Sequence, residues 1–326
     1  HLGTSIASLS TLQRVLVLGS NLRHDHPLFA QRIRQAARRG CAVHAINSEV
    51  QDWAMPVRHM VSDAATWVQA LADVAAAVAA EKGVSAPAAG TASDAALAIA
   101  KSLLGGECKA ILLGNAAAHH QRASSLLRLA NWIGEQTGAT VGYLTEAANT
   151  VGAQLVAAQP GVGGMNAGQM LAGGLKAVVL LNNEPEWDAA PGRAAKLALG
   201  KAQMVVSLSP FKANMDFCDG LLPISPFSET SGSFVNAEGR VQSFHAVVKP
   251  LGETRPAWKV LRVLGNLLGL PSFELESSQQ VLAQIPAVAQ APEGRVRAAV
   301  LSNASAAAID MTPATLAPVT ASIYAL

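Results

Sequence analysis

The side chains best suited to chemistry gather in one loop-rich segment, residues 227–244. Carboxylate, amide and guanidinium groups stand there within a few positions of one another, and Gly232 and Gly239 would let the backbone approach a ligand closely. Such groups can hydrogen-bond a polar cofactor, and two carboxylates can act as an acid and base pair. The polar candidates are Glu229, Asn236, Glu238, Arg240 and Gln242.

Asparagine also ends three strand-like apolar runs, at Asn21, Asn115 and Asn183. The carboxyl ends of parallel strands are where α/β proteins hold nucleotide-like ligands. The alternative is that glycine and asparagine simply tolerate the left-handed backbone of a tight turn. Neither Gly19-Ser20-Asn21 nor Gly114-Asn115 forms the GxGxxG pattern of a dinucleotide site, so a structural turn is the favoured interpretation.

Several kinds of centre are disfavoured by the residues themselves. The three cysteines are widely separated, whereas an iron–sulfur cluster needs four closely arranged thiolates. The histidine clusters at 24–26 and 119–120 lack the further ligands of a metal site. No GxSxG motif is present, and no cysteine stands beside an obvious base. We therefore assign no catalytic residue and no metal ligand.

Composition narrows the class of protein. Half of the 326 residues are hydrophobic, 14% are charged and the formal net charge is +2, which allows a large core and disfavours nucleic acid as a partner. An odd number of cysteines without CxxC indicates a reducing compartment. No apolar run is long enough for a transmembrane span. The chain starts at His1 without a signal peptide, and we interpret it as a piece of a longer cytoplasmic polypeptide.

The order of apolar runs and helical patterns predicts an α/β fold with parallel sheets. We expect a first α/β unit over 1–140, with 62–106 helical, and a second over 141–275 that carries the 227–244 loop. Residues 276–326 are expected to be an Ala/Pro-rich linker or a small detached element. Strands are expected at 15–18, 41–46, 110–113, 140–144, 178–181 and 204–206, and helices at 27–39, 121–137 and 255–268.

These residues resemble a known family. The stretch from Asn21 to His26-Pro27 and on to Gly40 is similar to the second domain of the molybdopterin oxidoreductases, and residues 176–242 are similar to their third domain, including the E…GxFxNxEGRxQ stretch at 229–242. The continuation from Lys249-Pro250 to Trp258 resembles the iron–sulfur subunit of bacterial NADH-quinone oxidoreductase, respiratory complex I. The resemblance implies Rossmann-like domains of the type found in formate dehydrogenase and dimethyl sulfoxide reductase.

The resemblance to this iron–sulfur subunit also implies a role. The whole enzyme would oxidise NADH, pass electrons through iron–sulfur clusters ([2Fe–2S] and [4Fe–4S]) to quinone and translocate protons. This fragment would be a non-catalytic scaffold without a redox centre or molybdopterin, with the clusters upstream. Its partners would be other peripheral-arm subunits, on the cytoplasmic side of the inner membrane. Its vestigial cofactor cleft would include Asn21, Asn115, Asn183, Glu229, Asn236, Glu238, Arg240 and Gln242.

Two other interpretations stay open. The non-catalytic scaffold is favoured over both, because the chain departs from the molybdenum enzymes. One departure is Ile46-Asn47-Ser48-Glu49, which stands in place of their Asp-Pro-Arg step. The alternative is a true molybdopterin-guanine-dinucleotide domain of a formate- or nitrate-type oxidoreductase, in which Asn236, Glu238 and Arg240 would bind the pterin or its phosphates. The third interpretation is an independent ligand-binding α/β module.

Overall fold

Two compact units, each with its own parallel sheet, make up the computed structural model, which describes residues 1–289, 294, 296 and 301–315. The first unit contains His1–Gly152, Val235–Arg240, Val296 and residues 301–315. The second contains Ala153–Phe234, residues 241–289 and Gly294. The expected fold class, α/β with parallel sheets, is confirmed.

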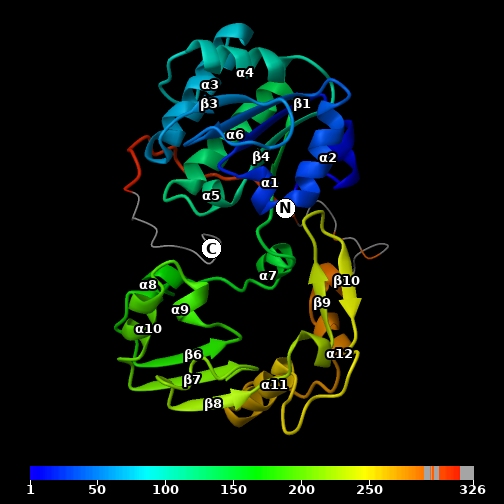
Figure 1. Cartoon of the computed structure of the whole chain (residues 1–326), viewed down its shortest axis with the longest axis vertical. Helices are drawn as coiled ribbons and strands as arrows, with labels where there is room; N and C mark the ends of the chain where they lie inside the picture. Colours follow the sequence, from blue (N-terminus) through cyan, green and yellow to red (C-terminus); the bar gives the residue numbers. More distant parts are fainter. Residues whose placement is uncertain (290–293, 295, 297–300, 316–326) are drawn as a thin grey trace. The chain divides into compact units, whose positions relative to one another are not determined.

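A five-stranded parallel sheet in the order β3-β2-β1-β4-β5 forms the centre of the first unit (Figure 1). Its strands are β1 (Arg14–Leu18), β2 (Ala42–Asn47), β3 (Arg58–Val61), β4 (Lys109–Leu113) and β5 (Thr140–Tyr143). Its helices are η1 (Ala7–Thr11), α1 (Leu22–Asp25), α2 (Pro27–Ala37), η2 (Ala64–Thr66), α3 (Trp67–Lys82), α4 (Asp94–Leu104), α5 (Asn115–Ala118) and α6 (Ala123–Thr137). Short α7 (Thr150–Leu155) follows.

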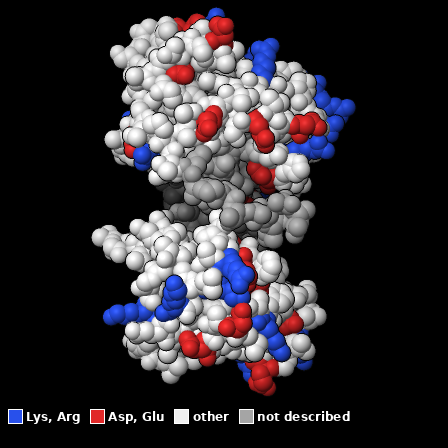
Figure 2. Space-filling model, turned by 60° about the vertical axis from the view of Figure 1, so that its left-hand side comes forward, with Lys and Arg blue, Asp and Glu red and all other residues white. Residues whose placement is uncertain are grey.

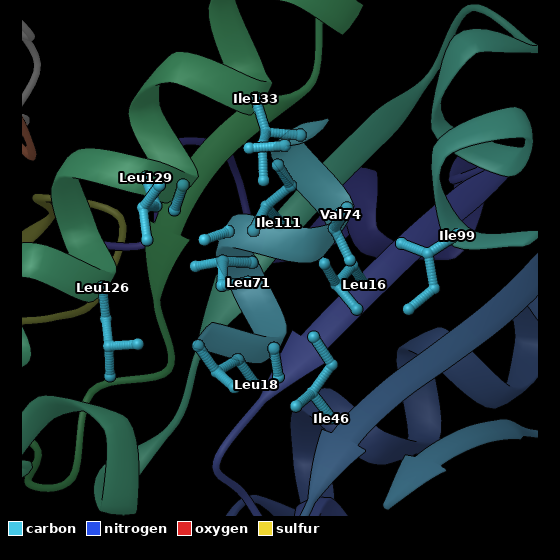
Figure 3. Close-up of a cluster of buried hydrophobic side chains, with 14 of the residues drawn as sticks. Leu16, Leu18, Ile46, Leu71, Val74, Ile99, Ile111, Leu126, Leu129 and Ile133 are labelled. Atoms are coloured by element: carbon cyan, nitrogen blue, oxygen red, sulfur yellow. The ribbon is translucent and has the colours of Figure 1, made fainter. Parts of the chain in front are cut away.

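The central strands of this sheet are buried on both faces, as their continuous apolar sequences predict. Successive side chains of β1 point to opposite faces, so Leu16 and Leu18 enter one core and Val15 and Val17 the other. Figure 3 shows the first core, in which side chains of β1, β2 and β4 meet those of α3, α4 and α6. Each fully buried leucine or isoleucine side chain there stabilises the fold by about 2 kcal/mol.

Part of the C-terminal region packs on this first unit. Asn303 accepts a hydrogen bond from the amino group of His1 at 2.9 Å and donates to the carbonyl oxygen of Val141 at 2.9 Å. Asp310 lies 3.1 Å from Arg122 of the segment that leads into α6. For residues 301–315 this differs from the expected linker or small detached element over 276–326, because hydrogen bonds between segments distant in the sequence leave no mark in composition. Residues 290–293, 295, 297–300 and 316–326 of that range lie outside the described residues. The first division between units also falls at 152/153 rather than 140/141.

The second unit is built on the three-stranded parallel sheet β6-β7-β8, made of β6 (Ala177–Leu181), β7 (Met204–Ser209) and β8 (Gly220–Pro223). Val178, Leu180, Leu199 and Val205 form its small core. Helices α8 (Ala167–Leu171), α9 (Pro185–Asp188) and α10 (Arg193–Leu199) lie on one side of the sheet and α11 (Ala257–Leu267) on the other (Figure 1). The remaining elements are η3 (Phe227–Glu229), the β9 (Gly232–Val235) and β10 (Val241–Phe244) pair, α12 (Ser278–Ala283) and α13 (Pro286–Ala289).

The apolar side of α11 is less buried than that of a helix packed on a complete core. Its residues Val263, Leu264 and Leu267 are 48%, 40% and 80% exposed. Gly265 is the buried residue of the helix, because the ring of Phe273 lies directly against it. The apolar stripe of α11 is real, but the described residues leave much of it uncovered.

On the face shown in Figure 2, small groups of basic and acidic residues are separated by uncharged areas. None of the helices that the structure describes has the length and apolar character needed to cross a lipid bilayer.

Candidate functional site

The strand order of the first sheet creates a natural ligand-binding position. The chain runs from β1 outward to β2 and β3, then returns to β4 on the other side of β1 and continues to β5. In sheets of this kind, ligands bind outside the carboxyl ends of the strands where the direction changes. Here that position is occupied by the turns after β1 and β4, which contain the predicted residues Asn21 and Asn115.

The two turns pack directly against each other. The N–H of Gly114 donates to the carbonyl oxygen of Leu18 at 2.8 Å, and the N–H of Ala116 donates to that of Gly19 at 3.0 Å. A Cβ atom on Gly114 would lie 2.3 Å from the Cβ of Ser20 and 2.6 Å from the oxygen of Gly19. Only glycine permits this approach, so the space between the turns is filled by the backbone itself.

The N–H groups of the turn after β1 are all engaged within the protein. Gly19 donates to the carbonyl oxygen of Ile46 at 3.0 Å, and Ser20 donates to Oδ1 of Asn47 at 3.1 Å. Asn21 donates to Oδ2 of Asp25 at 2.8 Å, and the Ser20 hydroxyl donates to the same carboxylate oxygen at 3.2 Å. The carboxylate of Asp25 therefore takes the donors that a bound anion would use.

The second unit repeats this arrangement after its first strand. The N–H of Glu184 donates to Oδ2 of Asp188 at 2.7 Å, four residues further on, across the short helix α9. The carbonyl oxygen of the predicted Asn183 accepts from Nδ2 of Asn214 at 2.9 Å. Both units thus close the turn after their first strand with an aspartate that follows at the same spacing.

We expect Asp25→Ala to lower the free energy of unfolding of the first unit by about 1 kcal/mol, because the N–H of Asn21 loses its acceptor. Amide hydrogen exchange of peptides covering α1 and α2 would measure the change. Asp188→Ala is the matched variant and should raise exchange in α9 while leaving α1 unchanged. Equal exchange in wild type and Asp25→Ala would contradict the role given to this carboxylate.

Three buried polar atoms near these turns lack a hydrogen-bond partner among the described residues. They are Oδ1 of Asn21, Nε2 of His26 and Oδ1 of Asn115. His26 is 5% exposed and precedes Pro27, the first residue of α2, as the sequence predicts. Burial lowers the pKa of His26, while Asp25, the neighbouring side chain of Asn115 and Glu146 act in the opposite direction.

The guanine dinucleotide cofactor implied by the family resemblance carries a pyrophosphate. We therefore ask whether the residues at the switch point could bind a pyrophosphate. A pyrophosphate needs backbone N–H groups or basic side chains around it. The turn after β1 instead presents the carboxylate of Asp25 with its N–H groups already bonded, and Glu146 lies close enough to influence His26. The described residues at this switch point therefore do not fit the pyrophosphate of a guanine dinucleotide.

The polar side chains of the 227–244 segment hold its own turn. Oδ1 of Asn236 accepts from the N–H groups of Glu238 at 3.1 Å and Arg240 at 2.9 Å. Gly239 adopts a φ of 81°, which completes the turn. Glu238 accepts from the N–H of Ile6 at 2.7 Å, and its other oxygen lies 3.5 Å from Nε of Arg240. These residues bind the turn to the N-terminal segment.

The predicted cleft residues consequently fall into separate groups. Asn21 and Asn115 lie at the switch point, whereas Asn236, Glu238 and Arg240 lie in the turn beside residues 2–6. Asn183, Glu229 and Gln242 belong to the second unit. There, Glu229 accepts from the N–H of Leu251 at 3.0 Å, and Gln242 is exposed on β10.

The histidine clusters are likewise used locally. His120 stacks on Trp67 with ring centroids 5.8 Å apart, and its Nε2 lies 2.9 Å from the carbonyl oxygen of Ala64. Nε2 of His119 lies 2.5 Å from a carboxylate oxygen of Glu146. Within the part of the chain that the structure describes, no group of three or more His, Cys, Asp or Glu side chains could hold a metal ion.

Sequence reasoning missed Asp25 and Asp188, the two residues that close the turns. The signal was available as a spacing: each aspartate stands four residues after the turn residue whose N–H it accepts, Asn21 and Glu184. The sequence also did not identify Asn47 as a hydrogen-bond partner of the turn after β1. Its amide accepts from the N–H of Ser20 and donates to the Ser20 carbonyl oxygen at 3.1 Å, which requires β2 to pair beside β1.

Comparison with known proteins gives short stretches of close similarity. A putative formate dehydrogenase of Staphylococcus aureus is 45% identical over 53 residues, which cover 16% of this chain and 5% of that protein. The mitochondrial 78 kDa subunit of NADH-ubiquinone oxidoreductase from Candida albicans is 41% identical over 71 residues, 21% of this chain and 10% of the relative. These matches therefore span a small part of the relatives' length.

A solved structure extends the comparison to most of the chain. Acetylene hydratase from Pelobacter acetylenicus superposes with a TM-score of 0.59 at 14% identity, covering 85% of this chain and 50% of that one, which establishes a shared fold. The family model for molybdopterin oxidoreductase matches residues 1–267. Since that match takes in both sheets, both closed turns and the 227–244 segment, the chain belongs to the molybdopterin oxidoreductase family.

Proposed function

We propose that this chain is the structural, molybdopterin-oxidoreductase-like part of the iron–sulfur subunit of an NADH:quinone oxidoreductase, and that it holds no redox centre itself. The observation that carries the proposal is the turn after β1, whose N–H groups are bonded internally and whose anion position is taken by Asp25. A family fold whose first switch point is closed by its own carboxylate is suited to support rather than to catalysis.

The parent enzyme in this proposal oxidises NADH and passes electrons through iron–sulfur clusters, located outside this chain, to quinone while protons are translocated. This chain contributes packing surface to the peripheral arm, on the cytoplasmic side of the inner membrane, where its partners are other subunits of the arm. The similarity to the 78 kDa subunit of NADH-ubiquinone oxidoreductase supports this assignment.

A second candidate function is a cofactor-binding domain of a formate dehydrogenase-like oxidoreductase. The similarity to putative formate dehydrogenases favours it, and so do the unpartnered buried atoms of Asn21, His26 and Asn115. In that case the 227–244 segment would have to release its internal hydrogen bonds to reach a pterin. Each N–H and carboxylate bond broken in this way would have to be replaced by a bond to the cofactor.

Cofactor analysis of the full-length protein, purified in its native complex, separates the two candidates. We expect molybdenum by elemental analysis and pterin by fluorescence after oxidation to be far below one per protein, because the N–H groups of Gly19, Ser20 and Asn21 are already bonded within the protein and the Asp25 carboxylate lies where the pyrophosphate would bind. A formate dehydrogenase purified in the same way is the positive control. Stoichiometric pterin would overturn the scaffold proposal and establish the second candidate.

A further inference from the structure

The sheet of the second unit is covered unequally on its two faces. Helices α8, α9 and α10 lie on one face, whereas α11 is the one helix of the described residues that lies on the other (Figure 1). On that other face Val179 is 56% exposed, Met204 is 55% exposed and Leu222 is 46% exposed. Parallel sheets are normally covered by helices on both faces, so within the described residues this face is only partly covered.

A hollow of about 910 Å³ lies between this open face and α11. Its walls are apolar, formed by Val179, Met204 and Leu222 of the sheet and by Val263 and Leu264 of the helix. We call this hollow the β6–α11 groove. Leu268, which follows the groove-lining residue Leu267, is also exposed, at 65%.

The charged groups of the β6–α11 groove are mainly basic. Arg255, Lys259 and Arg262 line it, against one carboxylate, Glu276. Arg255 already forms an ion pair with Glu253, with Nη2 3.4 Å from Oε2. Among the described residues, the structure gives no carboxylate partner to Lys259 or Arg262.

Two buried donors in the groove also lack acceptors. Nε1 of Trp258 and Nε of Arg262 have no hydrogen-bond partner within the described part of the chain. Lys259 extends over the Trp258 ring, with Nζ 5.5 Å from its centroid. An occupant that brings carboxylates next to an apolar face would satisfy both the donors and the apolar walls.

We propose that the β6–α11 groove is the docking site of an acidic amphipathic α-helix supplied by a partner protein. A helix beside α11 would cover the part of this face that the described residues leave open, and helix-in-groove docking places apolar side chains at i, i+3, i+4 and i+7 against such walls. Carboxylates beside that stripe would reach Lys259 and Arg262. The identity of the partner as a subunit of the peripheral arm rests on the proposed function, but the groove's chemistry does not.

Fluorescence anisotropy with a designed probe tests the proposal on the whole 326-residue chain. The probe is a labelled helical peptide with leucines at the spacing above and glutamates flanking them. We expect saturable binding that weakens about tenfold in Val263→Asp or Leu264→Asp. Leu197→Asp, at a 60% exposed leucine of α10 on the opposite face of the sheet, is the matched control and should bind as wild type does.

A charge exchange tests the acidic character of the occupant. Lys259→Glu should weaken the glutamate peptide about fivefold and strengthen a peptide of the same design with lysines in place of the glutamates. Equal binding of both peptides to the wild-type chain, or binding unaffected by Val263→Asp, would overturn the proposal.

Sedimentation velocity tests whether a second copy of this chain, rather than a partner helix, occupies the β6–α11 groove. If the chain is a dimer that Val263→Asp dissociates, the groove belongs to that contact and the proposal fails. Absence of peptide binding would also refute it while leaving the cofactor analysis of the proposed function untouched, so the two can fail separately.

Discussion

Gly114→Ala is expected to destabilise the first unit by about 3 kcal/mol, because the space beside Gly114 is already filled by backbone. The new methyl group would lie 2.3 Å from the Cβ of Ser20 and 2.6 Å from the carbonyl oxygen of Gly19. Relief requires β1 and β4 to separate, which would break the hydrogen bond from Gly114 to Leu18. Amide hydrogen exchange of peptides covering β1 and β4 would report this unit by itself.

The matched control is Gly161→Ala, at a loop glycine of the second unit whose added Cβ would meet nothing within 4 Å. We expect it to change stability by less than about 0.5 kcal/mol. Unchanged exchange in Gly114→Ala would mean that the turns after β1 and β4 can move apart freely. The space between them could then open for a ligand, contrary to the closed switch point described above.

Acid is expected to weaken the first unit through His44, a buried residue of β2. Burial, followed by the charges of Arg58 and Arg14, lowers the pKa of His44 to about 4. Between pH 6.5 and 4 the unfolded chain then binds a proton that the folded chain does not, so stability falls as pH falls. At pH 5 this loss amounts to about 2 kcal/mol relative to neutral pH.

His44→Leu should remove that part of the acid sensitivity. Leucine also removes the buried Nε2 of His44, which has no hydrogen-bond partner among the described residues, so stability at neutral pH should be equal or higher. Hydrogen exchange of β1 and β2 peptides at pH 7 and pH 5, corrected for intrinsic exchange rates, would measure both effects. The same loss between these pH values in wild type and variant would assign the acid sensitivity to other groups.

The elements of the sheets were largely predictable from local pattern. The apolar runs at 15–18 and 110–113 lie in strands buried on both faces, as a continuous run predicts. The runs at 178–181 and 204–206 also lie in strands, although one face of their sheet is exposed at Val179 and Met204. The helix ends were readable where glycine follows, as at Gly138, whose φ of 74° ends α6. Strand β3 was missed, since Arg58–Val61 pairs at an edge with partly exposed side chains and carries no such run.

The site was less predictable, since it depends on which turns meet. The sequence identified Asn21 and Asn115 as turn residues, but their shared location follows from β4 pairing with β1 rather than with β3. That Asn236, Glu238 and Arg240 lie close together was predictable, because they are close in the sequence. What they bind, however, is the N-terminal segment through Ile6, a contact between residues 232 positions apart.

By itself the sequence determined the class of fold, the family and the absence of a complete cysteine set for an iron–sulfur cluster within these 326 residues, because each depends on residue types and local spacing. Only the tertiary structure decided that Asp25 closes the turn at the switch point and that α11 leaves an apolar groove open. Both depend on which surfaces pack together. An amphipathic stripe or a carboxylate has the same sequence signature whether its partner lies within the chain or in another molecule.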